Sequence, residues 1–373
     1  MTVSAAVPSL KETQKVFGTN LYRKNIQPVW VKVENHTDDM LIITPMGLDA
    51  AYYTARESAH RSISNRKNRP PSGEFEVRAM SKILIPANSI RAGYIFSRVD
   101  EGTKSFNVDV YGGGQTYKMS FHIPVPGLTL YNYDLDINSF FPEDQYKDVT
   151  LPELAKELQA MPCCVVDAEG KDKGDPLNLV FVGSLLDMYY AFMRAGWDET
   201  ESIHSSSLLK TAMSAFSGGR YRYSPISKLY VFGRAQDAAL QKSRESIHER
   251  NHLRLWMTPL RHEGKPVWIG QISRDIGVRF TSRTITTHKI DPDVDETREY
   301  LVEDMAYAGT IAKLGYVSGV GPATYEQPRA NLTGDPYFTD GYRVVMWLSE
   351  EHTAITEIDV INPEEMKADS GQH

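Results

Sequence analysis

The side chains best suited to chemistry lie between positions 250 and 304. From His252 to Met257 the chain alternates polar and aliphatic residues, which predicts a strand with two unlike faces. The aliphatic face is expected against a core, whereas His252, Arg254 and Trp256 share the other face. An imidazole beside a guanidinium is suited to acid–base chemistry on an anionic group. The same pattern is equally typical of a half-exposed sheet face on which Arg254 stacks against Trp256.

A second group of polar residues opens the next expected helix. Asp291 followed by Pro292 is typical of a helix start, and the helix is expected to run to about Lys313. The apolar stripe of this helix is flanked by the side chains of Asp291, Asp295 and Arg298. Packing of that stripe beside the strand predicts that the carboxylates meet the imidazole and the guanidinium, because buried charges require partners.

We therefore expect both groups to contribute to one polar site. The residues expected to converge there are His252, Arg254, His288, Asp291 and Asp295. In a hydrolase-like interpretation, the catalytic residues are His252, His288 and Asp295. A divalent metal, as a candidate cofactor, would be held by Asp291 and His288.

The rest of that interpretation concerns anion binding and packing. An anionic group such as a phosphate would be held by Arg234, Arg254 and Arg298. The site would be packed by Trp256, Trp268 and Asp275. A structural interpretation has equal weight, because a buried ion-pair network that ties the helix to the sheet has the same residue composition.

Two metal-binding patterns in this region are false matches. The run from Asp291 to Asp295 resembles the start of a calcium-binding loop, but the sixth position is Glu296 and the twelfth is Val302, where glycine and glutamate are required. The segment 248–252 has the residue order of a zinc-protease motif. That motif needs both histidines on one helix, whereas His252 is expected to begin a strand.

Composition excludes several classes of protein. The chain has 373 residues, 41% of them hydrophobic and 24% charged, which is ordinary globular composition. The net charge of -7 gives no reason to expect a nucleic acid as partner. The two cysteines, Cys163 and Cys164, are adjacent, and adjacent cysteines rarely bridge each other. No run is long enough for a transmembrane helix, and no signal peptide is visible at the amino end.

The pattern of turns and strands divides the chain. Short alternating segments predict a β-sandwich scaffold or binding domain over residues 16–130, with an excursion at 50–73 that is expected to be partly mobile. A linker is expected at 131–149 and a mixed domain with a mainly antiparallel sheet at 150–350. The tail at 362–373 is expected to be loose.

The expected fold class is therefore α+β overall. Within the second domain, helices are expected at 202–216 and 235–250, and a strand at 225–233. Three further strands are expected at 253–258, 266–272 and 276–282.

Several short motifs in this second domain carry a resemblance to a known family. In the order the family shows, they are Asp175–Val180, Ala195–Trp197, Phe232–Arg234, His252–Trp256, Pro266–Trp268 and Thr287–Arg298. Together they resemble the LssY carboxy-terminal domain family over about residues 170–305. The family often has a second histidine after the threonine, where this chain has Lys289, so a site with two imidazoles at that turn is in doubt.

The resemblance implies a bacterial, envelope-associated and extracytoplasmic protein, because the family's domain also occurs fused to membrane phosphatase-like and DedA-like modules. Envelope proteins or membrane components are the partners it implies. Two functions follow from residues and resemblance together. One is a hydrolase-like site for an anionic, phosphate-bearing substrate. The other is a non-catalytic envelope binding or assembly protein in which the polar cluster is structural.

Overall fold

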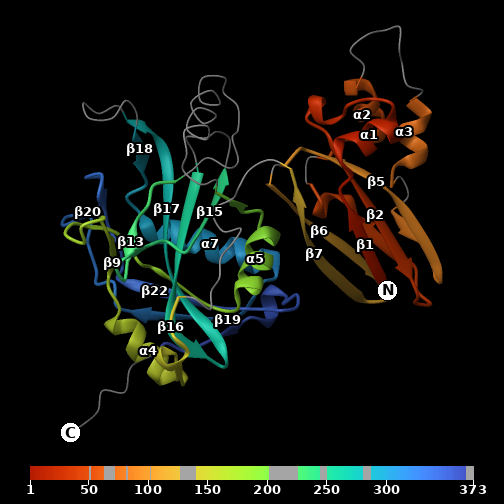
Figure 1. Ribbon diagram of the computed structural model, residues 1–373. Helices are drawn as coiled ribbons and strands as arrows, with labels where there is room; N and C mark the ends of the chain where they lie inside the picture. The colour runs from red at the N-terminus through yellow and green to blue at the C-terminus, as the bar shows by residue number, and fades with distance from the viewer. Residues whose placement is uncertain are drawn as a thin grey trace. The chain divides into compact units, whose positions relative to one another are not determined.

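The computed structural model describes nine stretches of the chain, which are residues 1–49, 52–62, 72–80, 83–100, 102–126, 140–200, 226–243, 250–279 and 287–366. The chain forms two compact units, Met1–Leu128 and Thr129–His373 (Figure 1). Each unit is described here by itself. The predicted α+β fold class is confirmed, and the largest sheet is mainly antiparallel.

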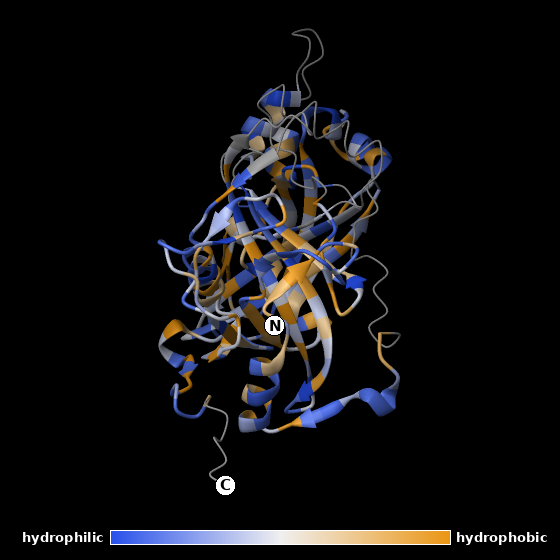
Figure 2. Cartoon of the chain, turned by 90° about the vertical axis from the view of Figure 1, so that its left-hand side faces the viewer, coloured by the Kyte–Doolittle hydropathy of each residue, from blue (hydrophilic) through white to orange (hydrophobic). Residues whose placement is uncertain are grey.

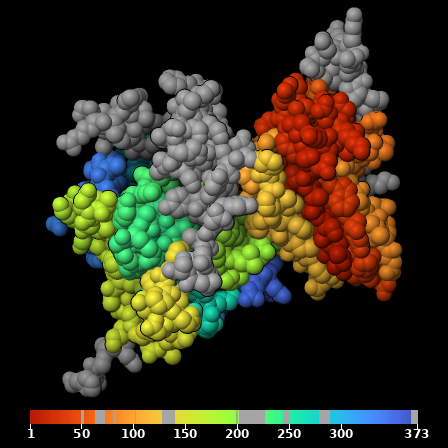
Figure 3. All heavy atoms as spheres, in the orientation of Figure 1, coloured from red at the N-terminus to blue at the C-terminus, as the bar shows by residue number. Residues whose placement is uncertain are grey.

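The first unit is built mainly from two antiparallel sheets. One sheet has the order β1-β2-β5 and the other β4-β3-β6-β7. Their bounds are β1 Thr2–Ala6, β2 Gln27–Asn35, β3 Leu41–Thr44, β4 Leu84–Ile85, β5 Ser89–Ser97, β6 Gly102–Gly112 and β7 Gln115–Val125. Alternating residues of both sheets, such as Val31 of β2 and Val108 of β6, share one core. Figure 3 shows the heavy atoms of this unit, in red and orange, as a closely packed surface.

In the described part of this unit, three α-helices accompany these sheets, and strand patterning alone did not predict them. They are α1 (Leu10–Phe17), α2 (Ala55–Ser62) and α3 (Ser72–Arg78). Phe17 and Phe75 of α1 and α3 pack with Phe96 of β5 in a second apolar cluster. The expected excursion at 50–73 contains helix α2 and the first two residues of α3, while residues 50–51 and 63–71 lie outside the described residues.

The second unit is organised around a ten-stranded sheet. Its main order is β12-β15-β16-β17-β11-β22-β19-β23, with β18 beside β17 and β8 beside β16. The bounds are β8 Lys147–Val149, β11 Leu179–Val182, β12 Asp198–Glu199, β15 Ala238–Ser243, β16 Arg250–His262, β17 Lys265–Arg279, β18 Thr287–Ile290, β19 Ile311–Ser318, β22 Tyr342–Leu348 and β23 Asp359–Val360. Because β8 already pairs with β16, this sheet begins inside the expected 131–149 linker.

The long hairpin of β16 and β17 forms the middle of this sheet. It turns at Glu263 and Gly264, which both have positive φ angles, 51° and 75°. Two consecutive left-handed residues make the tight turn that matches the twist of paired strands. The hairpin pairs Leu253 with Ile272 and Arg254 with Gln271, so each strand presents one aliphatic and one partly polar face. Figure 2 shows hydrophobic residues, in orange, and hydrophilic residues, in blue, following one another along strands of the chain.

Different elements cover the two faces of the sheet. Helices α5 (Leu185–Arg194) and α7 (Val294–Ala308) pack on the aliphatic face, where Leu255 contacts the same core as Leu301. The other face is covered by α4 (Leu151–Ala160), which packs on Val180 and Val345. A small sheet also lies on that face, with Trp256 in its core. Its strands are β10 Lys173–Pro176, β9 Cys164–Val166, β13 Tyr230–Val231 and β14 Arg234–Ala235.

Several expectations for the second unit are wrong in detail. The expected helix at 235–250 is a strand over Ala238–Ser243. This segment pairs with β16, from Ala238 opposite Leu255 to Ser243 opposite Arg250, and the pairing outweighs local helix propensity. The expected strand at 225–233 shortens to β13. The expected strands at 266–272 and 276–282 are one continuous strand, β17. The expected helix at 202–216 and residues 244–249 lie outside the described residues.

The polar helix also differs from its expected bounds. Its N-cap is Asp293, which accepts a hydrogen bond from the Glu296 amide at 3.0 Å. It ends at Gly309, whose φ of 72° is typical of a helix C-terminus. Residues around Lys313 belong to β19 instead. Met366, in the segment expected to be a loose tail, is buried against the core under α4.

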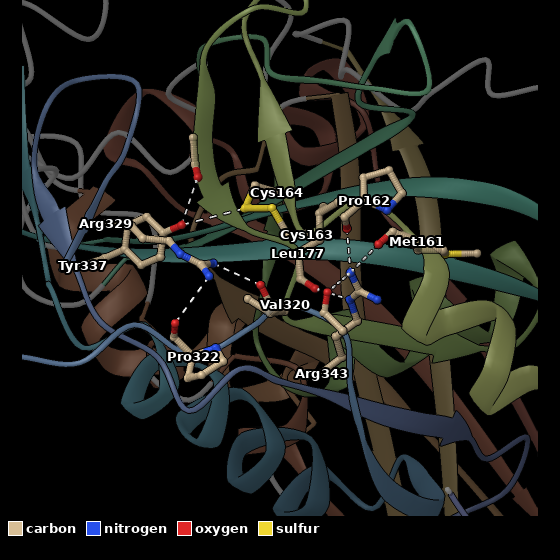
Figure 4. Close-up of a disulfide and its surroundings, with 12 residues drawn as sticks. Met161, Pro162, Cys163, Cys164, Leu177, Val320, Pro322, Arg329, Tyr337 and Arg343 are labelled. Atoms are coloured by element: carbon tan, nitrogen blue, oxygen red, sulfur yellow. Dashed lines mark hydrogen bonds between the residues drawn. A yellow bond between two sulfur atoms is a disulfide. The ribbon is translucent and has the colours of Figure 1, made fainter. Parts of the chain in front are cut away.

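A buried arginine joins several elements of this unit (Figure 4). The guanidinium of Arg343, at the start of β22, is 0% exposed. It donates hydrogen bonds to the carbonyl oxygens of Leu158, Met161, Pro162, Leu177 and Gly319. Burial lowers the pKa of Arg343 to about 10. The carbonyl cage compensates for the lost hydration of this cation.

Cys163 and Cys164 lie beside this cage and are joined by a disulfide. The expectation that adjacent cysteines do not bridge is therefore wrong here. The bond lies where the chain leaves α4 and enters β9. Among the helices that the structure describes, none combines the length and the apolar character needed to cross a membrane.

Replacement of Arg343 should destabilise the second unit strongly. Arg343→Ala leaves the carbonyls of the cage without their donor, and we expect a loss of about 3 kcal/mol or more in the free energy of unfolding. Arg329, which also donates to two carbonyls but nearer the surface, provides the control: Arg329→Ala should cost about 1 kcal/mol or less. Urea unfolding followed by circular dichroism measures both, and equal losses would contradict the argument.

Candidate functional site

A buried histidine–aspartate pair lies on the polar face of the β16–β17 hairpin. His252 Nε2 is 2.7 Å from Asp275 Oδ2, and the two residues are 6% and 2% exposed. His252 pairs with Ser273 across the hairpin, so Asp275, two residues further along β17, lies on the same face. Strand register therefore positions the carboxylate against the imidazole.

The protonation state of His252 follows from its surroundings. Burial lowers its pKa to about 4, against the opposing effect of Asp275, so the imidazole is neutral near pH 7. A neutral imidazole donates through one nitrogen only, and a carboxylate only accepts. Nε2 therefore carries the proton and donates to Asp275, which leaves Nδ1 as an acceptor. Nδ1 is buried without a hydrogen-bond partner among the described residues.

Two donor atoms on the same face also lack hydrogen-bond partners among the residues that the structure describes. Arg250, two residues before His252 on β16, donates through Nη1 to Gln241 at 3.0 Å. Its Nε lies 3.9 Å from Asp275 Oδ2, too far for a hydrogen bond, and this buried atom donates to no described residue. Gln271 Nε2 is also buried and has no hydrogen-bond partner among the described residues. Burial lowers the pKa of Arg250, which Asp275 opposes.

Arg254 lies beside these groups and is held by neutral oxygens. It donates to Gln271 Oε1 at 2.9 Å and to the Ser227 carbonyl at 3.2 Å. Its charge also acts on Asp175 of β10. Burial raises the pKa of Asp175, and the charge of Arg254 opposes this rise in part. One oxygen of Asp175, Oδ1, is buried without a hydrogen-bond partner among the described residues. We call Arg250, His252, Gln271 and Asp275 the buried polar site.

Asp295 and Arg298 do not belong to this site, and the expected convergence is wrong. Both residues are on α7, which packs on the aliphatic face through Leu301. His252 and Arg254 point to the opposite face of β16. Sequence periodicity identified the two faces of the strand and of the helix, but the helix covers the face that the imidazole does not occupy.

Asp295 and Arg298 instead form a paired network at the start of β22. Arg298 contacts Asp295 at 3.2 Å, Glu299 at 2.7 Å and Asp340 at 2.8 Å. Asp295 accepts from the Asp340 amide at 2.5 Å and from the Thr339 hydroxyl at 2.8 Å. This network anchors α7 to the loop before β22, and it includes neither His252 nor Arg254, which the structural interpretation placed in it. Beside it lies a groove of about 550 Å³.

The remaining predicted residues have separate positions. Asp291 accepts from the Asp293 amide, and its own amide donates to the Arg274 carbonyl. His288 lies in β18 and pairs with Val278, while its side chain lies outside what the structure describes. Within the described stretches, no three His, Cys, Asp or Glu side chains gather in a way that could hold a metal ion.

Arg234 and the two tryptophans have packing positions. Arg234 makes a two-point contact with Asp237, 2.9 Å at each oxygen, and its guanidinium lies 5.1 Å from the Phe141 ring centre. Trp256 packs on the face of the buried polar site and donates to the Arg234 carbonyl. Trp268 lies on the aliphatic face. The prediction that it packs the site around His252 is therefore wrong.

Sequence reasoning missed Arg250, Gln271 and the role of Asp275 as the direct partner of His252. Extending the alternation of β16 backwards by two residues would have placed Arg250 on the polar face. Gln271 becomes visible only through strand register. These residues define an α+β domain whose main sheet carries an incompletely paired polar group on one face.

A known protein family matches most of this α+β domain. Residues 158–342 match the family model described as LssY C-terminus, so the second unit carries a domain of the LssY C-terminal family. The matched segment includes the whole buried polar site. No curated protein matches the chain.

The neutral His252 should make folding pH-dependent. Its folded pKa of about 4 lies below the usual 6.5, so its contribution to stability is complete above pH 6.5 and is lost as the pH falls toward 4. The lost free energy is about 3 kcal/mol at 1.4 kcal/mol per pKa unit. Urea unfolding between pH 4 and 7.5 should show this slope in the wild type and a reduced slope in His252→Gln. Identical slopes would contradict a buried neutral histidine.

Asp295→Ala should lower stability without affecting the buried polar site. The change removes acceptors from Thr339 and the Asp340 amide and one partner of Arg298, so we expect a loss of about 2 kcal/mol. Glu303→Ala, an exposed change on the same helix, should alter stability by less than about 0.5 kcal/mol. Thermal melts of both variants measure the difference, and a wild-type melting temperature for Asp295→Ala would refute the anchoring role.

Proposed function

We propose that the buried polar site of the LssY-type domain binds a phosphate-bearing or similar anionic group and acts on it as a hydrolase. One observation carries the proposal. The Nδ1 atom of His252 is an acceptor with no hydrogen-bond partner among the described residues, and the bond from Nε2 to Asp275 holds the ring in place. Two donors that likewise find no partner in the described part of the chain, Arg250 Nε and Gln271 Nε2, share its sheet face.

The chemistry follows from the tautomer. Asp275 keeps the proton on Nε2, so Nδ1 is available to accept a proton from an attacking water molecule. Arg250 and Gln271 would donate to the oxygens of the anionic group, where charge develops in the reaction. The negative charge of a bound phosphate would raise the pKa of His252 toward neutrality and make it a stronger base.

The pairing of charges supports a ligand at this site. Buried polar atoms normally have hydrogen-bond partners, and each exception requires an explanation. The network of Arg298 has carboxylate partners at 2.7 to 3.2 Å, as a structural cluster should. Arg250 has a neutral amide oxygen and a distant carboxylate instead. A bound anion would supply the missing acceptor for Arg250 Nε.

The second candidate is a non-catalytic envelope binding or assembly protein. The three carboxylate contacts of Arg298 favour it for that part of the domain, because they are structural ion pairs. An extracytoplasmic, envelope-associated location is part of both proposals and rests on the family resemblance. Fractionation of native cells with an antibody to the chain tests it, and recovery with cytoplasmic markers would refute it.

Ligand binding and turnover separate the two candidates. We expect the purified chain to bind inorganic phosphate in calorimetry and to hydrolyse p-nitrophenyl phosphate. Arg250→Gln should weaken phosphate binding at least tenfold, about 1.4 kcal/mol, because it removes the charged donor. His252→Gln should keep binding within about threefold and lose turnover by about a hundredfold or more.

Arg261→Gln is the matched control, because it removes an arginine whose partner Glu143 is on the surface. It should leave binding and turnover unchanged. Circular dichroism would establish that every variant is folded. If the wild type binds no phosphate and hydrolyses no phosphomonoester, the anion-hydrolase proposal is wrong and the structural interpretation stands.

A further inference from the structure

The disulfide of Cys163 and Cys164 lies at a junction of the second unit (Figure 4). Cys164 pairs with Pro176 where β9 meets β10, and the carbonyl of Cys163 accepts from the Leu177 amide at 2.8 Å. The two sulfurs differ in their surroundings. Cys164 is 4% exposed, whereas Cys163 is more exposed.

A hydroxyl group lies beside the buried sulfur. The Tyr337 oxygen is 3.8 Å from Cys164 Sγ and 3.4 Å from the Gly174 carbonyl. In the disulfide form this hydroxyl donates to the Gly174 carbonyl. On reduction it would turn to the nearby Cys164 sulfur and donate to the thiolate formed there. In thiol–disulfide exchange, the sulfur that accepts electrons leaves faster when its thiolate is stabilised. The surroundings therefore favour attack at Cys163 and departure of Cys164.

We propose that Cys163–Cys164 is a reversible thiol–disulfide exchange site for a dithiol reductant. A thiolate of the reductant attacks Cys163 Sγ, the S–S bond breaks, and Cys164 leaves with the electron pair as a thiolate. The second thiol of the reductant, as its thiolate, then attacks the reductant's sulfur in the mixed disulfide, and Cys163 leaves as a thiolate. The products are the reduced cysteine pair, once both thiolates take up protons, and the oxidised, disulfide form of the reductant.

The structural consequence of reduction is local. The residues before the disulfide, Met161 and Pro162, supply two carbonyls of the Arg343 cage. Leu158, Leu177 and Gly319 supply the others. Reduction removes the link between adjacent side chains, so the segment 161–164 gains freedom while the remaining carbonyls keep Arg343 in place. The expected change is loosening of the β9–β10 pairing without global unfolding. This inference is independent of the proposed hydrolase activity.

The first test is chemical and uses the whole native chain. Without reductant, neither cysteine should react with iodoacetamide, as read by intact mass. After treatment with dithiothreitol under native conditions, both should react, and phenylarsine oxide, which bridges two neighbouring thiols, should protect both. Two free thiols in air-oxidised protein, or reduction only in denaturant, would overturn the proposal.

The second test concerns the leaving sulfur. Tyr337→Phe removes the hydroxyl beside Cys164 and should slow reduction by dithiothreitol about threefold or more. Tyr325→Phe, at a tyrosine that is 79% exposed, is the matched control and should leave the rate unchanged. Equal rates for the two variants would overturn the assignment of Cys164 as the leaving sulfur.

The third test follows the structural response. Hydrogen exchange measured by mass spectrometry should become at least tenfold faster in peptides covering 161–178 when the wild type is reduced, with the β16–β17 hairpin unchanged. The double variant Cys163→Ser, Cys164→Ser should be insensitive to reductant. An exchange pattern in the wild type that does not respond to reduction would show that the bond has no conformational role.

Discussion

The arrangement of the second unit depends on the burial of one cation. Arg343 has no exposed surface, and a buried guanidinium is tolerated only when its donors are satisfied. Its donors reach the end of α4, the residue after β10 and the residue after β19. These contacts hold β22 between β11 and β19 in the sheet. They also tie the helix α4, which covers one face of the sheet, to the strands beneath it.

The sheet separates two polar groups that have different degrees of pairing. On the side of α7, Arg298 is surrounded by carboxylates, which makes the network a strong anchor and a poor site for an anion. On the other side, His252 has one carboxylate, and atoms of His252, Arg250 and Gln271 have no partner among the described residues. Incomplete pairing in a buried place is expensive for folding. Its presence distinguishes the buried polar site as the functional candidate.

Local patterns predicted some elements well and others poorly. Alternation around His252 predicted a strand with an aliphatic and a polar face, and β16 has both. The same reasoning predicted a helix at 235–250, where Ala238–Ser243 is a strand because β16 pairs with it. Short segments with helical and strand character of similar strength are decided by their neighbours. The disulfide between adjacent cysteines likewise contradicted a general expectation for such pairs.

Taken alone, the sequence determined the α+β class, the two faces of β16, the apolar stripe of α7 and membership of the second unit in its family. Only the tertiary structure decided which face of the sheet α7 covers, and therefore that Asp275, not Asp291 or Asp295, is the partner of His252. The physical reason is that side-chain periodicity is a local property of the backbone. The face on which a helix packs depends on chain connections and on contacts between residues far apart in sequence, such as those of Arg343.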